Sequence, residues 1–170
     1  MTPAELIKIG IHPDNRDANY KRIGWHEYFM EIAKLISKRS LDAETQHGCV
    51  AVRNNIIIGT GYNSYPSGAR DNILPNLRKG GFKYPFLNHS ESSLIYTAAR
   101  NGVALDGCTI YITGRPCFNC ARQLISVGIT DWIIGDITHV SNEIEDLHYK
   151  FLVESHNVKV REYKDLIASN

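Results

Sequence analysis

Two short motifs place three metal-ligating side chains and one carboxylate in a fixed pattern: His89-Ser90-Glu91 and Pro116-Cys117-Phe118-Asn119-Cys120. One imidazole and two thiolates form the ligand set of a catalytic zinc site, which keeps its fourth tetrahedral position open for water. A water held there loses a proton near neutral pH and becomes a nucleophile. The Glu91 carboxylate, which does not bind the metal, is placed to move that proton. The motifs therefore predict that His89, Cys117 and Cys120 hold Zn²⁺ and that Glu91 is catalytic.

The spacing within each motif agrees with the start of a helix. Proline is favoured as the first helical residue because its missing N–H would be unpaired there anyway, so a helix is expected from Pro116. Cys117 and Cys120 then lie on one face of the first turn, where the helix dipole favours thiolates. A second helix is predicted for residues 90–99, with Asn88 as its cap and His89 at its start.

Other chemistries use one half of this pattern. Cys-x-x-Cys alone also occurs in thiol redox proteins and in structural zinc sites, where Cys49 or Cys108 would be the fourth ligand. In a structural site, however, Glu91 would have no purpose. His-x-Glu followed by Pro-Cys-x-x-Cys is the signature of zinc-dependent deaminases of cytosine and adenine rings, and we interpret the pair in this way.

Composition limits the class of protein. A chain of 170 residues with 43% hydrophobic and 22% charged residues is typical of one globular domain. No apolar run approaches the roughly 20 residues of a membrane span, and the first residues lack the features of a signal peptide. A soluble, cytoplasmic protein is therefore expected. The net charge of +1, without a run of basic residues, argues for a small substrate over a polynucleotide.

Hydrophobic periodicity predicts the order of helices and strands. A helix is expected over residues 25–40, with a core-facing stripe of Tyr28, Phe29, Ile32, Leu35 and Ile36. A β-hairpin is expected over residues 48–62, turning at 54–55. Strands at 109–113, 132–135 and 157–161 alternate with helices at 116–128 and 141–155, the last with Ile144, Leu147, Phe151 and Leu152 on one face.

Strands that alternate with helices run parallel, so these elements predict an α/β fold: a three-layer α-β-α arrangement, with a mixed five-stranded sheet covered by helices on both faces. Residues 23–170 are expected to form a single domain behind an N-terminal extension, 1–22. The loop at 63–87 runs directly into the His89 helix and is interpreted as part of the pocket wall. Cys49 and Cys108 lie in apolar, strand-like segments and are predicted to be buried.

Other segments of the chain are distinctive: Trp25-x-Glu27-Tyr28-Phe29-Met30, Arg39-Ser40-x-Asp42, Gly61-Tyr62-Asn63, Asp71-x-x-Leu74-Pro75, Lys83-Tyr84-Pro85 and Ala98-Ala99-Arg100-Asn101-Gly102. Together with the zinc motif, these segments resemble the deoxycytidylate (dCMP) deaminases of the cytidine deaminase superfamily. The resemblance extends from Trp25 to Gly128 and is more specific than the zinc motif alone.

The resemblance implies conversion of dCMP to dUMP with release of ammonia, which supplies thymidylate synthesis. It implies that Glu91 delivers a proton to ring N3 and protonates the departing ammonia. It also implies that Asn63 binds the sugar hydroxyl and that the backbone N–H of Ser90 faces the base carbonyl. Members of the family form homo-oligomers, here expected between a dimer and a hexamer, and dCTP and dTTP, with Mg²⁺, are the implied allosteric effectors.

The chain departs from the family pattern close to the motifs. The residues that differ from those usual in the family are His47, Ser64, Ser90, Ser93 and the pair Gly114-Arg115. His47 and Arg115 add hydrogen-bond donors where apolar groups are usual. The alternative substrate is therefore a 5-substituted dCMP, such as 5-hydroxymethyl-dCMP, and a polynucleotide deaminase is a second alternative.

The phosphate group of a nucleotide must meet positive charge or backbone donors. From the resemblance, the candidate cations are Arg39, Lys83 and Arg100.

Overall fold

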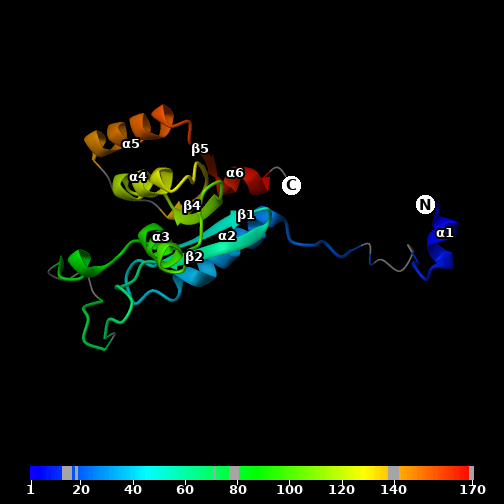
Figure 1. Cartoon of the computed structure of the whole chain (residues 1–170), viewed down its shortest axis with the longest axis horizontal. Helices are drawn as coiled ribbons and strands as arrows, with labels where there is room; N and C mark the ends of the chain where they lie inside the picture. Colours follow the sequence, from blue (N-terminus) through cyan, green and yellow to red (C-terminus); the bar gives the residue numbers. More distant parts are fainter. Residues whose placement is uncertain (13–16, 18, 71, 77–80, 138–141, 169–170) are drawn as a thin grey trace.

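A five-stranded sheet in the order β2-β1-β3-β4-β5 organises the protein (Figure 1). The computed structural model describes residues 1–12, 17, 19–70, 72–76, 81–137 and 142–168. β1 (Gly48–Arg53) runs antiparallel to β2 (Ile56–Tyr62) and to β3 (Thr109–Gly114). β4 (Asp131–Ile137) and β5 (Lys159–Glu162) continue the sheet parallel to β3. The predicted mixed five-stranded sheet is thus confirmed.

Helices cover both faces of the sheet (Figure 1). α2 (Trp25–Ser37) and α6 (Tyr163–Ala168) pack on one face, while α3 (Ser90–Arg100), α4 (Phe118–Ser126) and α5 (Glu143–Ser155) lie on the other. Each face has its own buried core, which includes Phe29, Met30, Tyr111 and Ile133 on the first side and Leu94, Ala121, Leu124 and Trp132 on the second. The three-layer α-β-α architecture is confirmed.

The first long helix is shorter and more exposed than its sequence pattern predicts. α2 ends at Ser37 instead of Ser40, and Tyr28 and Leu35 are 40% and 64% exposed. Of the predicted stripe, Phe29 is buried and Ile32 and Ile36 pack partly buried against the core, while Met30 and Ala33 complete the buried face. The helix α2 lies very close to the sheet: a Cβ added at Gly48 would be 2.2 Å from the carbonyl oxygen of Ala33.

The helix α3 begins at Ser90 as predicted but has a different N-cap, and α4 begins two residues later than predicted. His89, and not Asn88, is the N-cap of α3, because Asn88 exchanges two backbone hydrogen bonds with Ser64. Cys117 is the N-cap of α4, where its Sγ accepts from the backbone N–H of Cys120. Pro116 therefore precedes the helix instead of starting it.

The C-terminal third also differs from the pattern. α5 begins at Glu143 behind an Asn142 cap, and Ser141 is outside the described residues. Its predicted apolar face is largely exposed, at 65% for Ile144, 66% for Leu147 and 74% for Phe151, because α5 turns Tyr149 towards the core instead. The short helix α6 was not predicted.

The β-hairpin follows its sequence closely. The hairpin turns at Asn54 and Asn55, whose φ values of 53° and 59° are left-handed as the residue types suggest. Near the N-terminus, α1 (Pro3–Lys8) has a capping box formed by Thr2 and Glu5 and buries no residue. It lies away from the rest of the molecule (Figure 1). The division at residue 22 stays a prediction.

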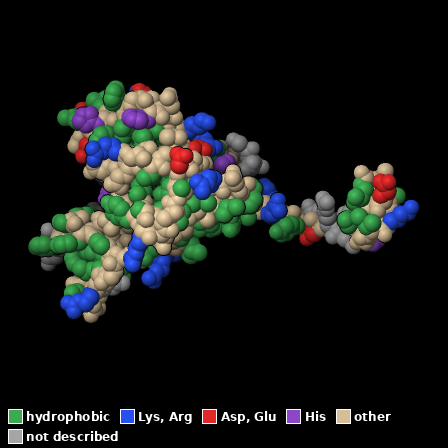
Figure 2. Space-filling view, in the orientation of Figure 1, with side chains coloured by type: hydrophobic (Ala, Val, Ile, Leu, Met, Phe, Trp, Pro, Cys, Tyr) green, Lys and Arg blue, Asp and Glu red, His purple; other side chains and the backbone are tan. Residues whose placement is uncertain are grey.

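Within the described parts of the chain, no helix is both long and apolar enough to span a membrane. Figure 2 shows the Lys and Arg side chains of the visible face scattered over it instead of gathered in one patch. On this face the chain lacks the basic stripe that long nucleic acids require.

Gly61 lies where β2 passes beneath the start of α3. A Cβ at this position would lie 2.1 Å from Ser90 O and 2.7 Å from Leu94 N, and both of these atoms belong to the backbone. Gly61→Ala should therefore displace the helix that carries Glu91 and lower the free energy of unfolding by about 2 kcal/mol or more. Urea unfolding followed by circular dichroism measures this loss.

Gly59→Ala is the matched control on the same strand. Its Cβ would approach only the end of the flexible Leu94 side chain, at 2.8 Å. Its unfolding midpoint should stay closer to that of the wild type. Equal midpoints for the two variants would contradict the tight packing of α3 against β2.

Candidate active site

The three predicted metal ligands lie together at the starts of α3 and α4. His89 Nδ1 is 3.5 Å from the Sγ atoms of both Cys117 and Cys120, and the three ligand atoms lie within 4.8 Å of one another. Ligands 2.0–2.3 Å from a tetrahedral zinc ion are about 3.6 Å apart. The donor set and its spacing therefore fit Zn²⁺.

The cysteine pair is suited to bind a cation. Hydrogen bonds from Cys120 and His89 lower the pKa of Cys117 to about 3 despite its burial. The pKa of Cys120 is raised, mainly by the hydrogen bond of its thiol to the Cys117 sulfur and then by burial. A dication between the sulfurs would stabilise both as thiolates.

The cluster also bears on the structural-zinc alternative. Among the described residues, it contains three potential ligands and neither Cys49 nor Cys108. Those two thiols are buried in the core, at 0% and 1% exposure, as the sequence predicts. A three-ligand cluster leaves one tetrahedral position open, which is the arrangement of catalytic sites.

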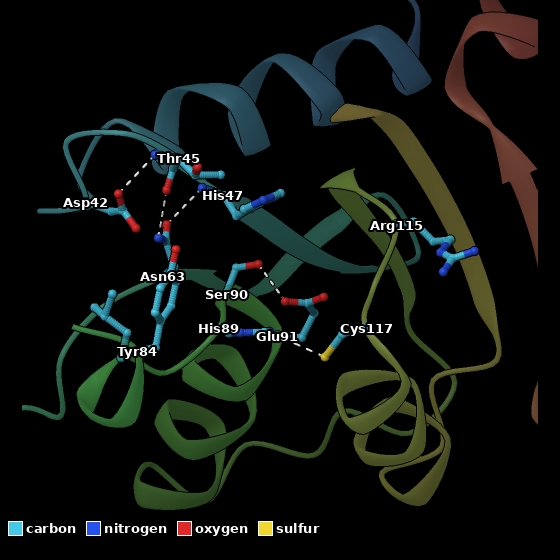
Figure 3. A pocket seen from close by; sticks show the side chains of 11 residues that line it. Asp42, Thr45, His47, Asn63, Tyr84, His89, Ser90, Glu91, Arg115 and Cys117 are labelled. Carbon is cyan, nitrogen blue, oxygen red and sulfur yellow. Dashed lines mark hydrogen bonds between the residues drawn. The ribbon is translucent and has the colours of Figure 1, made fainter. Parts of the chain in front are cut away.

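Glu91 lies beside the ligand cluster in the first turn of α3. It is 5% exposed, and its Oε2 accepts a hydrogen bond of 2.7 Å from the Ser90 hydroxyl. Burial raises the pKa of Glu91, and the hydrogen bonds from its own backbone N–H and from Ser90 oppose this shift. The carboxylate is therefore held in one orientation next to His89 and Cys117 (Figure 3).

A cavity of about 260 Å³ opens onto these groups. We call it the catalytic cavity, and its lining residues are Asp42, Thr45, His47, Asn63, Tyr84, Leu87, His89, Ser90, Glu91, Arg115 and Cys117 (Figure 3). Tyr84 and Leu87 come from the loop predicted to form the pocket wall; residues 71 and 77–80 of that loop are outside the described chain.

Four lining residues were not predicted as site residues. Asp42 and Tyr84 belong to the segments that resemble dCMP deaminases, so the sequence contained a signal for them. Leu87 lies in the loop predicted to form the pocket wall, whereas Thr45 had no signal, since it lies in an irregular segment that only the fold brings to the cavity.

Asn63 connects β2 to the segment before β1. Its Oδ1 accepts the backbone N–H of His47 at 2.8 Å, and its Nδ2 donates to Thr45 O at 2.9 Å. These bonds fix the amide at the wall of the cavity and leave one N–H and one lone pair for a ligand. His47 lines the same wall, and its Nδ1 lies 3.5 Å from the Thr113 hydroxyl.

Arg115 lines the cavity but points away from Glu91 (Figure 3). Its guanidinium donates to Asp146 of α5 at 2.6 Å and lies 4.6 Å from the centre of the Tyr149 ring. The guanidinium of Arg115, which stands where an apolar group is usual in the family, thus contacts α5. Its predicted contact with a substrate stays a prediction.

Not all predicted residues meet at the catalytic cavity. Arg39 lines a different cavity of about 340 Å³, together with Ser64 and Ser93, whose hydroxyls are 3.0 Å apart. Arg100 lines neither of these two cavities. Lys83 is 1% exposed and faces carboxylates instead of the catalytic cavity. Of the predicted phosphate-binding cations, none lines the cavity that contains Glu91.

Comparison with known proteins agrees with this geometry. The model of the cytidine and deoxycytidylate deaminase zinc-binding region matches residues 23–136. The chain belongs to this deaminase family. It is a nucleotide deaminase, as the signature of the two motifs predicts.

Individual relatives extend the match beyond the zinc motifs. The chain is 38% identical to human deoxycytidylate deaminase over 125 residues, which cover 70% of this chain and 69% of the human protein. It is 31% identical to the deoxycytidylate deaminase of Schizosaccharomyces pombe over 165 residues, covering 88% of this chain and 47% of the yeast protein. Its fold is similar to that of the dCMP deaminase from cyanophage S-TIM5, solved with dCMP and dUMP, with a TM-score of 0.65 and 22% identity over 84% of this chain and 99% of that one.

Proposed function

We propose that this protein catalyses the hydrolytic deamination of dCMP to dUMP, with release of ammonia. The observation that carries the proposal is the convergence of a buried carboxylate, Glu91, with the His89, Cys117 and Cys120 cluster at one cavity. The substrate is inferred from relatives named deoxycytidylate deaminase that are 38% identical to the chain. A supply of dUMP for thymidylate synthesis would be the metabolic consequence.

The reaction forms a bond between a water oxygen and C4 of the base and breaks the bond from C4 to the amino nitrogen. Zn²⁺ held by the three ligands would supply an activated water at its open position. Glu91 would accept a proton from the water, place it on ring N3 and pass the second proton to the departing amino group. Of the two water protons, one stays on N3 and one leaves with ammonia.

The other residues of the cavity would orient the substrate. The Ser90 hydroxyl holds the Glu91 carboxylate, and the Ser90 N–H is the proposed donor to the base carbonyl. Asn63, fixed through two backbone hydrogen bonds, would use its remaining N–H and lone pair for the sugar hydroxyl.

Plain dCMP is favoured over a 5-substituted nucleotide. The relatives are named for dCMP, and the Arg115 guanidinium, one of the two added donors, is engaged with Asp146 and Tyr149. A homo-oligomer, regulation by dCTP or dTTP with Mg²⁺, and a cytoplasmic location stay predictions from the sequence.

Ammonia release by the zinc-loaded protein tests the substrate. The compounds compared are dCMP, 5-hydroxymethyl-dCMP, dCTP, deoxycytidine and AMP. We expect dCMP to give the highest kcat/KM, by about tenfold or more over deoxycytidine, because the phosphate adds charge-assisted contacts. A higher kcat/KM for 5-hydroxymethyl-dCMP would transfer the assignment to a 5-substituted substrate. No turnover of any of the five would overturn the proposal.

A further inference from the structure

Lys83 forms the most buried ion cluster of the described chain. Its side chain is 1% exposed, and its Nζ donates to Asp42 Oδ1 at 2.7 Å and to Glu44 Oε2 at 2.9 Å. The side chain of Asp42 is also buried, at 6% exposure, whereas that of Glu44 is 38% exposed. The Lys83 ammonium lies 5.5 Å from the centre of the Tyr84 ring. A lysine is almost never this buried unless it is paired.

The cluster stands behind the wall of the catalytic cavity. Asp42 and Tyr84 line the cavity, but Lys83 does not. A phosphate bound beside Asp42 would meet the Asp42 carboxylate first, with the Lys83 ammonium on its far side. This order of charges explains why Lys83 is poorly placed to bind a phosphate directly.

A continuous set of contacts joins Lys83 to the proposed sugar-binding residue. Asp42 Oδ1 accepts the backbone N–H groups of Glu44 and Thr45, at 2.9 and 3.0 Å. The carbonyl oxygen of Thr45 in turn accepts a hydrogen bond from Asn63 Nδ2, and Asn63 Oδ1 accepts the backbone N–H of His47. The ion pair thus fixes the 42–47 segment, and this segment fixes Asn63.

Charge gives the cluster a second role. Burial opposes ionisation of Asp42, but the hydrogen bonds from Lys83 and from two backbone N–H groups outweigh it and lower the pKa of Asp42. Asp42 is therefore an anion at the wall of the cavity. A nucleotide monophosphate carries about −1.5 to −2 charges near neutral pH, and like charges brought together cost several kcal/mol.

We propose that Lys83 is a positioning residue for nucleotide binding: it neutralises Asp42 towards the substrate phosphate and holds the 42–47 segment against Asn63. The inference rests on the proposed function, since it concerns the phosphate of the substrate. In this proposal Lys83 is the counterion of the Asp42 carboxylate, and it does not bind the phosphate itself.

The test compares a nucleotide with its nucleoside. In Lys83→Met, the KM for dCMP should rise by about tenfold or more, with a smaller rise for deoxycytidine, because only the nucleotide carries a phosphate. Calorimetric binding of dUMP gives a second readout that does not depend on turnover. Lys34→Met is the matched control: Lys34 pairs with Glu31 at 2.8 Å on the exposed surface of α2, at 44% exposure.

The double variant Lys83→Met/Asp42→Asn separates three explanations, and it answers the question even where the single variant does not fold. With Asp42 neutral, our proposal expects the preference for dCMP over deoxycytidine to return to within about threefold of wild type. A preference that stays low would show that Lys83 binds the phosphate directly and would overturn the proposal. Equal losses for dCMP and deoxycytidine would show a merely structural role and would also overturn it.

The wild-type protein distinguishes this inference from the proposed function. If wild type does not turn over dCMP, the proposed function fails, and binding of dCMP and deoxycytidine to the same variants then decides the role of Lys83. If wild type is active and Lys83→Met is unchanged, this inference alone fails.

Discussion

Glu91→Gln is expected to lower kcat for dCMP by about 10³-fold, because the amide can neither accept nor deliver the protons that the reaction moves. Glutamine has the same shape and still accepts a hydrogen bond from Ser90, which reaches the Glu91 carboxylate at 2.7 Å in the wild type. The fold and the zinc content should therefore be retained. Ammonia release, circular dichroism and zinc analysis of the same preparation measure the three quantities.

Glu154→Gln is the matched control for this variant. Glu154 lies on the outer surface of α5, where its side chain is 66% exposed and 3.9 Å from Lys150. The same chemical change there should leave kcat within about twofold, since an exposed ion pair contributes little. If Glu91→Gln kept more than a tenth of the wild-type kcat, another group would have to move the proton.

The second large effect is expected at the metal ligands. Cys117→Ser replaces a thiolate with a hydroxyl that stays protonated near neutral pH, so the variant should bind Zn²⁺ at least about 100-fold more weakly. After dialysis against a chelator, the wild type should retain close to one zinc per chain and the variant almost none. Deaminase activity should be lost with the metal.

Cys108→Ser makes the same substitution at a thiol outside the cluster. Cys108 is 1% exposed and belongs to the core beneath α3 and α4, so its variant can lose stability but should keep zinc. Stoichiometric zinc in Cys117→Ser would contradict the assigned ligand set. Readdition of Zn²⁺ to the dialysed wild type should restore its activity, which separates metal loss from irreversible unfolding.

The meeting of the candidate catalytic groups was predictable because the spacing within each motif is local. Cys117 and Cys120 are three residues apart, and His89 and Glu91 are two apart, so each pair is positioned by a single helix start. The chemistry of zinc then requires the two pairs to meet. The one-residue error in the α3 cap and the two-residue error in the α4 start did not matter, because both N-caps, His89 and Cys117, still present their side chains to the same point.

The mixed character of the sheet was predictable for a similar reason. Alternation of strands with helices predicts parallel neighbours, and the Asn54-Asn55 turn predicts an antiparallel hairpin. Periodicity was less informative about burial. In α5 it identifies an apolar stripe, but Ile144, Leu147 and Phe151 are exposed, since a stripe in one helix does not show whether another element covers it.

The partners of the long charged side chains were decided by the tertiary structure alone. Lys83 meets Asp42 across 41 residues of sequence, and Arg115 meets Asp146 across 31. Local spacing contains no information about such pairs, and a lysine near a pocket has the same sequence signal whether it faces a phosphate or a carboxylate. The sequence by itself thus determined the proposed reaction centre, which depends on two helix starts and on the coordination geometry of one metal ion. The charges around the substrate depend on how distant loops pack, and only the folded chain brings those loops together.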